Sequence, residues 1–182
     1  MEPARTAARL AILVAFAALG ALGCGGGRPR QLPLEGRSTA APPKHEHLAT
    51  IERIGCYGSC PVYKLTVYRD GAVEYEGEQY VKVEGKAAGE LRPEEVTALE
   101  ELFRKHRYLE LKDSYEYEGY THAASVYTAY TPAGGKRKDV RHYMGDISAP
   151  QRLVTIEEGI DAVVKIEQWI GTRAERDKLL GR

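Results

Sequence analysis

Residues 62–75 read VYKLTVYRDGAVEY and give the clearest indication of the fold class. Residues 62–68 alternate apolar and polar side chains and are rich in β-branched and aromatic types, which is typical of a half-buried strand. Asp70-Gly71 follows, and the tight turns that join two antiparallel strands need the positive φ that glycine supplies. We therefore expect residues 72–75 to pair back as a hairpin. Residues 79–83 either extend this hairpin or add a strand before Gly85.

The same order of elements recurs later in the chain. Residues 124–131 are again strand-like, residues 132–135 form a Pro-Ala-Gly-Gly turn, and residues 139–143 are the expected return strand. A helix follows each hairpin. The first opens at Pro93-Glu94-Glu95, where proline suits the first turn and the acids face the positive end of the helix dipole. The apolar residues of the two helices recur at helical spacing: Val96, Leu99, Leu102 and Phe103 before His106 in the first, and Leu153, Ile156, Ile160, Val163 and Ile170 after Pro150 in the second.

This order predicts an α+β fold. A doubly wound fold alternates single strands with helices, whereas tight hairpins favour an antiparallel sheet. We expect a sheet built from two hairpins, each followed by a helix packed on one face. Gly159 lies inside the second helix at a cost of about 1 kcal/mol relative to alanine.

The N-terminus has the pattern of an export signal. Arg5 and Arg9 give a basic start, residues 10–22 are apolar, and small residues precede Cys24, so residues 1–23 are expected to be a signal peptide. Residues 19–24 resemble the lipobox of bacterial lipoproteins, which implies that Cys24 is lipidated and anchors the chain to a membrane, facing the periplasm or the exterior. Two acyl chains bind a bilayer durably. Because Leu22 lies later than the usual leucine of that pattern, cleavage to a soluble product is the alternative.

The rest of the chain divides by composition. Residues 24–47 comprise the lipid-anchor site and a flexible tether rich in glycine and proline, residues 48–171 form a single α+β domain, and residues 172–182 form a charged C-terminal tail. The 26 basic residues balance the 26 acidic ones and no long run of one sign occurs. The basic surface of a nucleic-acid-binding protein is therefore missing, and no nucleic-acid partner is expected.

Cys56 and Cys60 remain as an even pair if Cys24 carries lipid, and an oxidising compartment favours a disulfide between them. Gly58 permits the turn that such a bridge requires, and Pro61 suits the first position of the strand that follows. The spacing differs from the Cys-x-x-Cys of thioredoxin-like centres. A redox-active pair and a metal site remain alternatives to a structural bridge, although two thiolates supply only half of the usual zinc ligands. No cofactor and no metal site are assigned.

The sequence Cys56-Tyr57-Gly58-Ser59-Cys60-Pro61-Val62-Tyr63, followed by Asp70-Gly71, resembles a bacterial domain-of-unknown-function family, number 6438. Its pattern is Cys-x-Gly-x-Cys-Pro-x-Tyr, a strand and an Asp-Gly turn. The resemblance continues through residues 111–115, 143–145 and 149–150, Ile160-Asp161 and Trp169-Ile170. It implies an exported or lipoprotein-type domain and supplies no catalytic residue. Where the family tends to carry Asp after Thr, this chain has Thr121-His122.

Other candidate residues have ordinary structural explanations. His45 and His47 lie in the expected tether, and His106 lies where a positive charge favours the end of a helix. His122 and His142 are expected on neighbouring strands, where two histidines act as ligands or as acid and base only with a third group. The serines lack the Gly-x-Ser-x-Gly context of a nucleophile. We assign no catalytic residue and expect a protein that is not an enzyme.

Tyrosine dominates the aromatic residues, with 12 tyrosines against 2 phenylalanines. Tyrosine rings with a polar tip suit both half-exposed sheets and recognition surfaces. Tyr115, Tyr117 and Tyr120 are the candidate binding surface, and we expect the first two to be partly exposed in a loop; ordinary half-buried tyrosines are the alternative. The sequence thus indicates a non-enzymatic envelope domain that binds a protein, peptide or glycan. The alternative is an extracytoplasmic thiol-disulfide redox protein that uses Cys56 and Cys60.

Overall fold

The computed structural model of the protein describes residues 45–116 and 122–181. Seven strands lie within this range: β1 (His47–Ile54), β2 (Val62–Tyr68), β3 (Ala72–Gln79), β4 (Gly85–Glu90), β5 (Ser114–Tyr115), β6 (Ser125–Tyr130) and β7 (Lys138–Tyr143). The helices are α1 (Pro93–Lys105), the short 3₁₀ helix η1 (Tyr108–Glu110), α2 (Gln151–Val163), α3 (Glu167–Ile170) and α4 (Arg173–Leu179). The fold is α+β.

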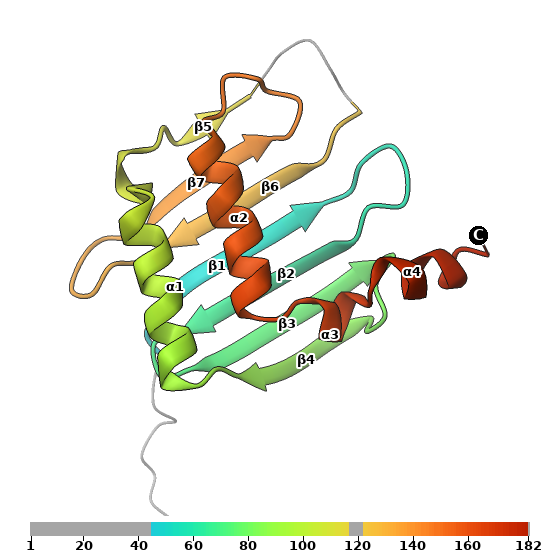
Figure 1. The fold of residues 1–182 in the computed structure, drawn as a ribbon, viewed down its shortest axis with the longest axis horizontal. Helices are drawn as coiled ribbons and strands as arrows, with labels where there is room; N and C mark the ends of the chain where they lie inside the picture. The colour runs from blue at the N-terminus through green and yellow to red at the C-terminus, as the bar shows by residue number, and fades with distance from the viewer. Residues whose placement is uncertain (1–44, 117–121, 182) are drawn as a thin grey trace, which may run out of the picture. The chain divides into compact units, whose positions relative to one another are not determined.

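The strands form one sheet in the order β4-β3-β2-β1-β6-β7-β5 (Figure 1). All neighbouring pairs are antiparallel except β5 and β7, which are parallel. The two expected hairpins are present as β2–β3 and β6–β7. The expected sheet of two hairpins is incomplete. In the structure β1 joins the two hairpins at the centre of the sheet, and β4 and β5 extend its edges. The extra strand after β3 lies at Gly85–Glu90 and not at residues 79–83.

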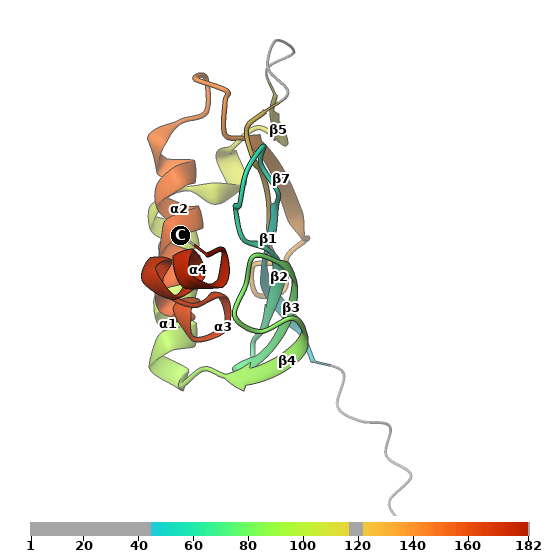
Figure 2. The ribbon, with the colours of Figure 1, turned by 90° about the vertical axis from the view of Figure 1, so that its right-hand side faces the viewer.

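The helices cover only one face of the sheet (Figure 2). Tyr63, Leu65 and Val67 of β2 are buried towards the helices, while the side chains between them are more exposed. This alternation follows from the strand geometry, which sends successive side chains to opposite faces. The core lies between the sheet and the helices, and the opposite face carries charged pairs such as Glu52 with Lys64.

The Asp70-Gly71 turn joins β2 to β3 as expected. Gly71 has φ of 91°, and an added Cβ would lie 2.5 Å from the backbone oxygen of Leu91. The Ala72 amide donates a hydrogen bond to the Asp70 carboxylate at 3.2 Å. Glycine is required here both by the conformation and by the close approach of the chain that leaves β4.

The two long helices cross at a glycine. A Cβ at Gly159 of α2 would lie 2.6 Å from a methyl group of Leu102 of α1. The lower helix propensity of glycine is therefore offset by close packing of the helices. The helix α1 ends at His106, its C-cap residue, as the sequence predicts.

The chain after α2 differs from expectation. The expected second helix ran on to Ile170, but α2 ends at Val163 and Lys165 has φ of 52°, so Ile170 lies in the separate helix α3. The charged tail contains α4. Thr172 and Glu175 form its capping box, in which the Thr172 amide donates to the Glu175 carboxylate at 2.7 Å and the Glu175 amide donates to the Thr172 hydroxyl at 3.2 Å. This reciprocal capping stabilises a short helix in a polar segment.

Candidate functional site

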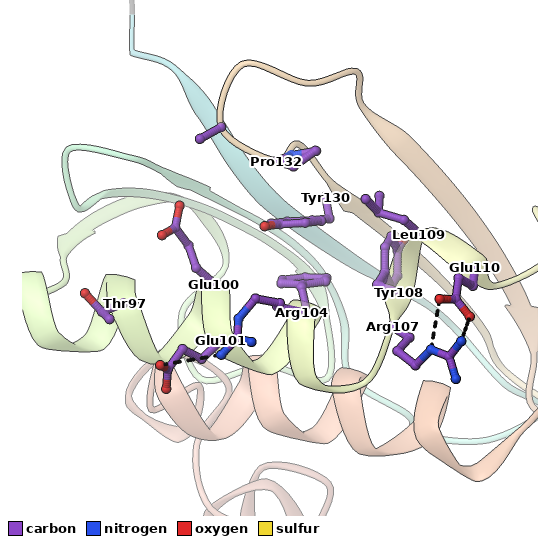
Figure 3. A pocket seen from close by; sticks show the side chains of 12 residues that line it. Thr97, Glu100, Glu101, Arg104, Arg107, Tyr108, Leu109, Glu110, Tyr130 and Pro132 are labelled. Carbon is purple, nitrogen blue, oxygen red and sulfur yellow. Dashed lines mark hydrogen bonds and ion pairs between the residues drawn. The ribbon is translucent and has the colours of Figure 1, made fainter.

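A groove of about 600 Å³ opens between α1, η1 and the turn that joins β6 to β7 (Figure 3). The helix α1 supplies one wall and starts with Pro93, while Glu95 accepts a hydrogen bond from the Arg92 amide at 2.9 Å. This capping fixes the start of α1. The other wall comes from η1 and from Tyr130, Pro132 and Ala133.

Three aromatic rings form the floor of the groove. The rings of Phe103 and Tyr130 stack with their centroids 4.4 Å apart and 5° between their planes. Tyr108 meets Phe103 edge-on at 5.0 Å, and its hydroxyl hydrogen-bonds with that of Thr128 at 2.9 Å. Burial, and next the charge of Glu100, raises the pKa of Tyr130. The floor is therefore apolar at neutral pH.

The charged side chains around the groove already have partners. Arg107 donates a hydrogen bond to Glu110 at 2.9 Å and forms an ion pair with it at 2.8 Å, and Arg104 lies 3.9 Å from Glu101. Glu100 is paired with Arg69, which also donates to the backbone oxygen of Thr131. What remains available to a ligand is mainly apolar, including Leu109, which is 52% exposed.

A polar cluster, separate from the groove, lies under α2. Asp161 accepts hydrogen bonds from Arg53 of β1, at 2.7 and 3.1 Å, and from the Tyr63 hydroxyl at 2.6 Å. Burial opposes the charge on Arg53, but Asp161 and then Tyr63 outweigh it and raise the pKa of the guanidinium. Burial, followed by the charge of Asp161, raises the pKa of Tyr63. Each group is engaged by another, so this cluster joins α2 to the sheet.

His142 and Glu157 form a buried pair one turn earlier in α2. The His142 ring nitrogen Nδ1 lies 2.9 Å from the Glu157 carboxylate, and the side chains are only 4% and 1% exposed. His122 is engaged elsewhere: its backbone oxygen accepts from the Tyr57 amide at 3.1 Å and its ring lies 5.4 Å from that of Tyr57. The two histidines thus have different partners. Glu157 was missed in the sequence, although an acid between Ile156 and Ile160 on an apolar helix face signals a buried partner.

The predicted cysteine bridge is present. Cys56 and Cys60 form a disulfide with an S–S distance of 2.00 Å and a Cα–Cα distance of 5.7 Å. Tyr57, inside the bridged loop, is 88% exposed.

The expected exposure of Tyr115 is wrong. Tyr115 is 5% exposed, because β5 turns its ring into the core, and its hydroxyl accepts a hydrogen bond from the Lys112 amide at 3.1 Å. Tyr117, Tyr120 and Cys24 lie outside the described residues. The half-exposed Leu109 provides accessible apolar surface instead, and nothing in its spacing marks it.

The histidines of the N-terminal segment also have partners. His45 lies 2.5 Å from the Asp70 carboxylate, and His47 hydrogen-bonds with the hydroxyls of Thr131 and Thr50 at 2.7 and 2.9 Å. Within residues 45–116 and 122–181, no three histidine, cysteine or acidic side chains gather in a way that could hold a metal ion. No helix in the same ranges has the length and apolar character needed to cross a membrane.

One family model matches residues 47–164, from β1 to just beyond α2, and its description is Domain of unknown function (DUF6438). The matched region contains the groove, the disulfide and both polar pairs under α2. No curated protein matches the sequence.

Proposed function

The chain belongs to the DUF6438 family of domains of unknown function, and we propose from its structure and its N-terminal sequence that it is a non-enzymatic binding module of the cell envelope. Its ligand is an extended peptide of a partner protein, which places an apolar side chain in the groove between α1, η1 and the β6–β7 turn. The observation that carries this proposal is the apolar surface of the groove at Leu109, which is 52% exposed while the charges around it are paired.

The volume and lining of the groove support a peptide ligand. Binding pockets for small ligands typically occupy about 300–1,000 Å³ and combine apolar walls with a few polar groups. Figure 3 shows the Tyr130 hydroxyl directed away from Leu109. A peptide carbonyl is a suitable acceptor for it. An apolar side chain between Leu109 and Pro132 would displace water without disturbing the paired charges.

The groove is tested with two matched variants. Peptides selected from a random library displayed on phage against the full-length protein serve as the probe. Leu109→Asp is expected to weaken binding of a selected peptide at least about tenfold, because a charge enters the apolar groove. Ile147→Asp is the control, since Ile147 is 98% exposed and lies outside the groove. Equal affinities of both variants, or no selected peptide, would exclude the groove as the binding site.

The envelope location rests on Cys24 and the signal pattern before it. We propose that Cys24 carries lipid and is the first residue of the mature chain, so that the segment between Cys24 and β1 tethers the domain to the membrane. Incorporation of labelled palmitate is expected in the wild-type protein and is lost in Cys24→Ser. Unchanged labelling and membrane association in that variant would contradict the anchor.

A redox function is the second candidate, because the Cys56–Cys60 bridge lies in a partly exposed loop. The two proposals differ in the reduction potential that they require. A structural disulfide has a potential below about −300 mV, whereas a catalytic one lies in or above the range of the glutathione pool. Equilibration with dithiothreitol redox buffers measures it, and we expect a potential in the structural range.

A further inference from the structure

The strand β4 leaves one edge of the sheet unpaired. Its neighbour on one side is β3, and Figure 1 shows no element of the described chain beyond it on the other side. The opposite edge of the sheet ends in β5, which has only two residues. An uncovered edge strand presents free backbone groups to another chain. The open edge at β4 spans six residues and contains neither proline nor a bulge.

The register identifies the backbone groups that face outwards. The Leu91 amide donates to the Gly71 oxygen at 2.8 Å, and Gly71 and Leu91 continue the register of β3 with β4. In an antiparallel pair, hydrogen-bonded positions alternate along the strand. Residues 85, 87 and 89 therefore bond to β3, and Lys86, Ala88 and Glu90 direct their amide and carbonyl groups to the open edge.

The side chains at these positions are exposed and complementary in charge. Lys86, Ala88 and Glu90 lie on the face of the sheet opposite the helices, and all three are exposed. Lys86 and Glu90 have no ion-pair partner within the part of the chain that the structure describes, whereas nearby Lys82 is paired with Glu175. The two charges lie at equal distances along the strand on either side of Ala88, so the edge is complementary to itself.

We propose that β4 pairs with β4 of a second copy of this chain, antiparallel and with Ala88 opposite Ala88 of the second copy. In this register each facing pair of outward positions exchanges two backbone hydrogen bonds. Lys86 lies opposite Glu90 of the second copy, and Glu90 opposite Lys86. On the other face, Ala87 meets Gly89, which lies under Trp169 and has no side chain that would obstruct the approach.

The register favours a second copy over an unrelated strand, because a two-fold axis through Ala88 pairs both charges at once with no other sequence required. A contact that uses the same surface on both copies closes after two chains and gives a dimer. Pairing along six residues is small compared with the roughly 1,200–2,000 Å² of stable interfaces, so the dimer is weak and reversible. The inference is independent of the groove, which lies beside α1.

Cysteine crosslinking tests the pairing in the full-length protein. In Ala88→Cys, the introduced thiols face each other at a hydrogen-bonded pair, where the Cα atoms are about 5.5 Å apart and a disulfide can form. We expect a disulfide-linked dimer on a non-reducing gel after mild oxidation. Ala98→Cys is the control, because Ala98 is an exposed alanine on α1. The wild-type protein, which lacks the introduced cysteine, shows how much dimer is crosslinked through Cys24. Absence of the dimer, or equal crosslinking through Ala98→Cys, overturns the proposal.

A charge reversal tests the register. In the Ala88→Cys background, Glu90→Lys places like charges opposite each other twice and is expected to lower the dimer yield about tenfold. Glu90 is chosen because its neighbour on β3 is the uncharged Ala72, whereas Lys86 faces Glu76. Glu158→Lys makes the same change of charge on the exposed side of α2 and should leave the yield unchanged. Equal yields in the two variants would refute this register, and with it the two-fold pairing.

Discussion

The contacts of α1 and α2 with the same sheet are of opposite chemical kinds. Under α1, Phe103 packs against the rings of Tyr108 and Tyr130. Under α2, Asp161 binds Arg53 and Tyr63, and Glu157 binds His142. The first zone is aromatic, whereas the second adds ionic and hydrogen-bonded pairs to buried aliphatic residues such as Ile156 and Ile160.

This difference determines what each helix can do. Stacked rings attract one another over a range of positions, so the aromatic zone can open at its margin into a groove without leaving a polar group unpaired. A buried carboxylate requires its partners at fixed distances, because an unpaired buried charge is very costly. The helix α2 is therefore held in one position on the sheet, while the margin of α1 is available for a ligand.

Raising the pH should have the largest effect on stability, because it ionises buried tyrosines in both zones. Burial raises the pKa of Tyr75 to about 12, and it also raises the pKa of Tyr63 under α2 and of Tyr108 under α1. The ordinary pKa of tyrosine is about 10, so these residues stabilise the fold below pH 10, and this stabilisation is lost as the pH rises above it. We expect the protein to unfold in alkaline solution, with tyrosinate absorption and loss of circular dichroism appearing together. Ionisation of all tyrosines near pH 10 in a folded protein would contradict the burial of these hydroxyls.

Asp161→Asn should have the next largest effect, because it breaks the ionic zone with almost no change of shape. The guanidinium of Arg53 loses its carboxylate while four-fifths of its side chain stays buried. Removing one partner of a fully buried pair costs about 3–5 kcal/mol, and the partial exposure here reduces this to about 2 kcal/mol. Urea unfolding at neutral pH measures the loss. Asp177→Asn on α4 is the control: this carboxylate forms no ion pair with the residues that the structure describes, so the unfolding free energy is expected to change little.

Phe103→Leu makes a comparably small change of shape in the aromatic zone. We expect a loss of about 1 kcal/mol, because one apolar side chain replaces another of similar size and no polar group is left without a partner. The same urea experiment allows direct comparison with Asp161→Asn. If Phe103→Leu costs as much as Asp161→Asn or more, the proposed tolerance of the aromatic zone is wrong.

The sequence predicts the local features of the fold better than its assembly. The alternation of apolar and polar residues, together with the Asp70-Gly71 turn, is sufficient to predict the β2–β3 hairpin. The cysteine pair with Gly58 between its members predicts the Cys56–Cys60 disulfide. The strand β4 escapes prediction, because Gly-Lys-Ala-Ala-Gly-Glu has low strand propensity and is held by its pairing with β3.

The candidate functional site was also hard to predict, because its contacts depend on how distant segments of the chain pack together. The alternation of Tyr115 and Tyr117 with glutamates is compatible with exposed or buried rings, and the parallel pairing of β5 with β7 buries Tyr115. Arg53 meets Asp161 across 108 positions of sequence. A buried ion pair of this kind is specified by the packing of α2 on the sheet, which no local pattern contains.

The smallest expected effect concerns the ion pair that connects the two helices. Glu95, in the first turn of α1, accepts hydrogen bonds from Arg92 at 3.0 Å and from Lys165, just beyond α2, at 2.8 Å. Arg92 and next Lys165 lower the pKa of Glu95 to about 2. A lowered pKa stabilises the fold above the ordinary value of about 4.3, and the contribution is lost as the pH falls from there towards 2. Glu95→Gln should therefore reduce stability slightly at neutral pH and show a shallower decline than the wild type between these two pH values, measured by urea unfolding. The exposed neighbour Glu94 provides the control, because Glu94→Gln keeps the contact between the helices. Identical pH profiles for wild type and Glu95→Gln would mean that the aromatic and ionic zones hold their helices independently.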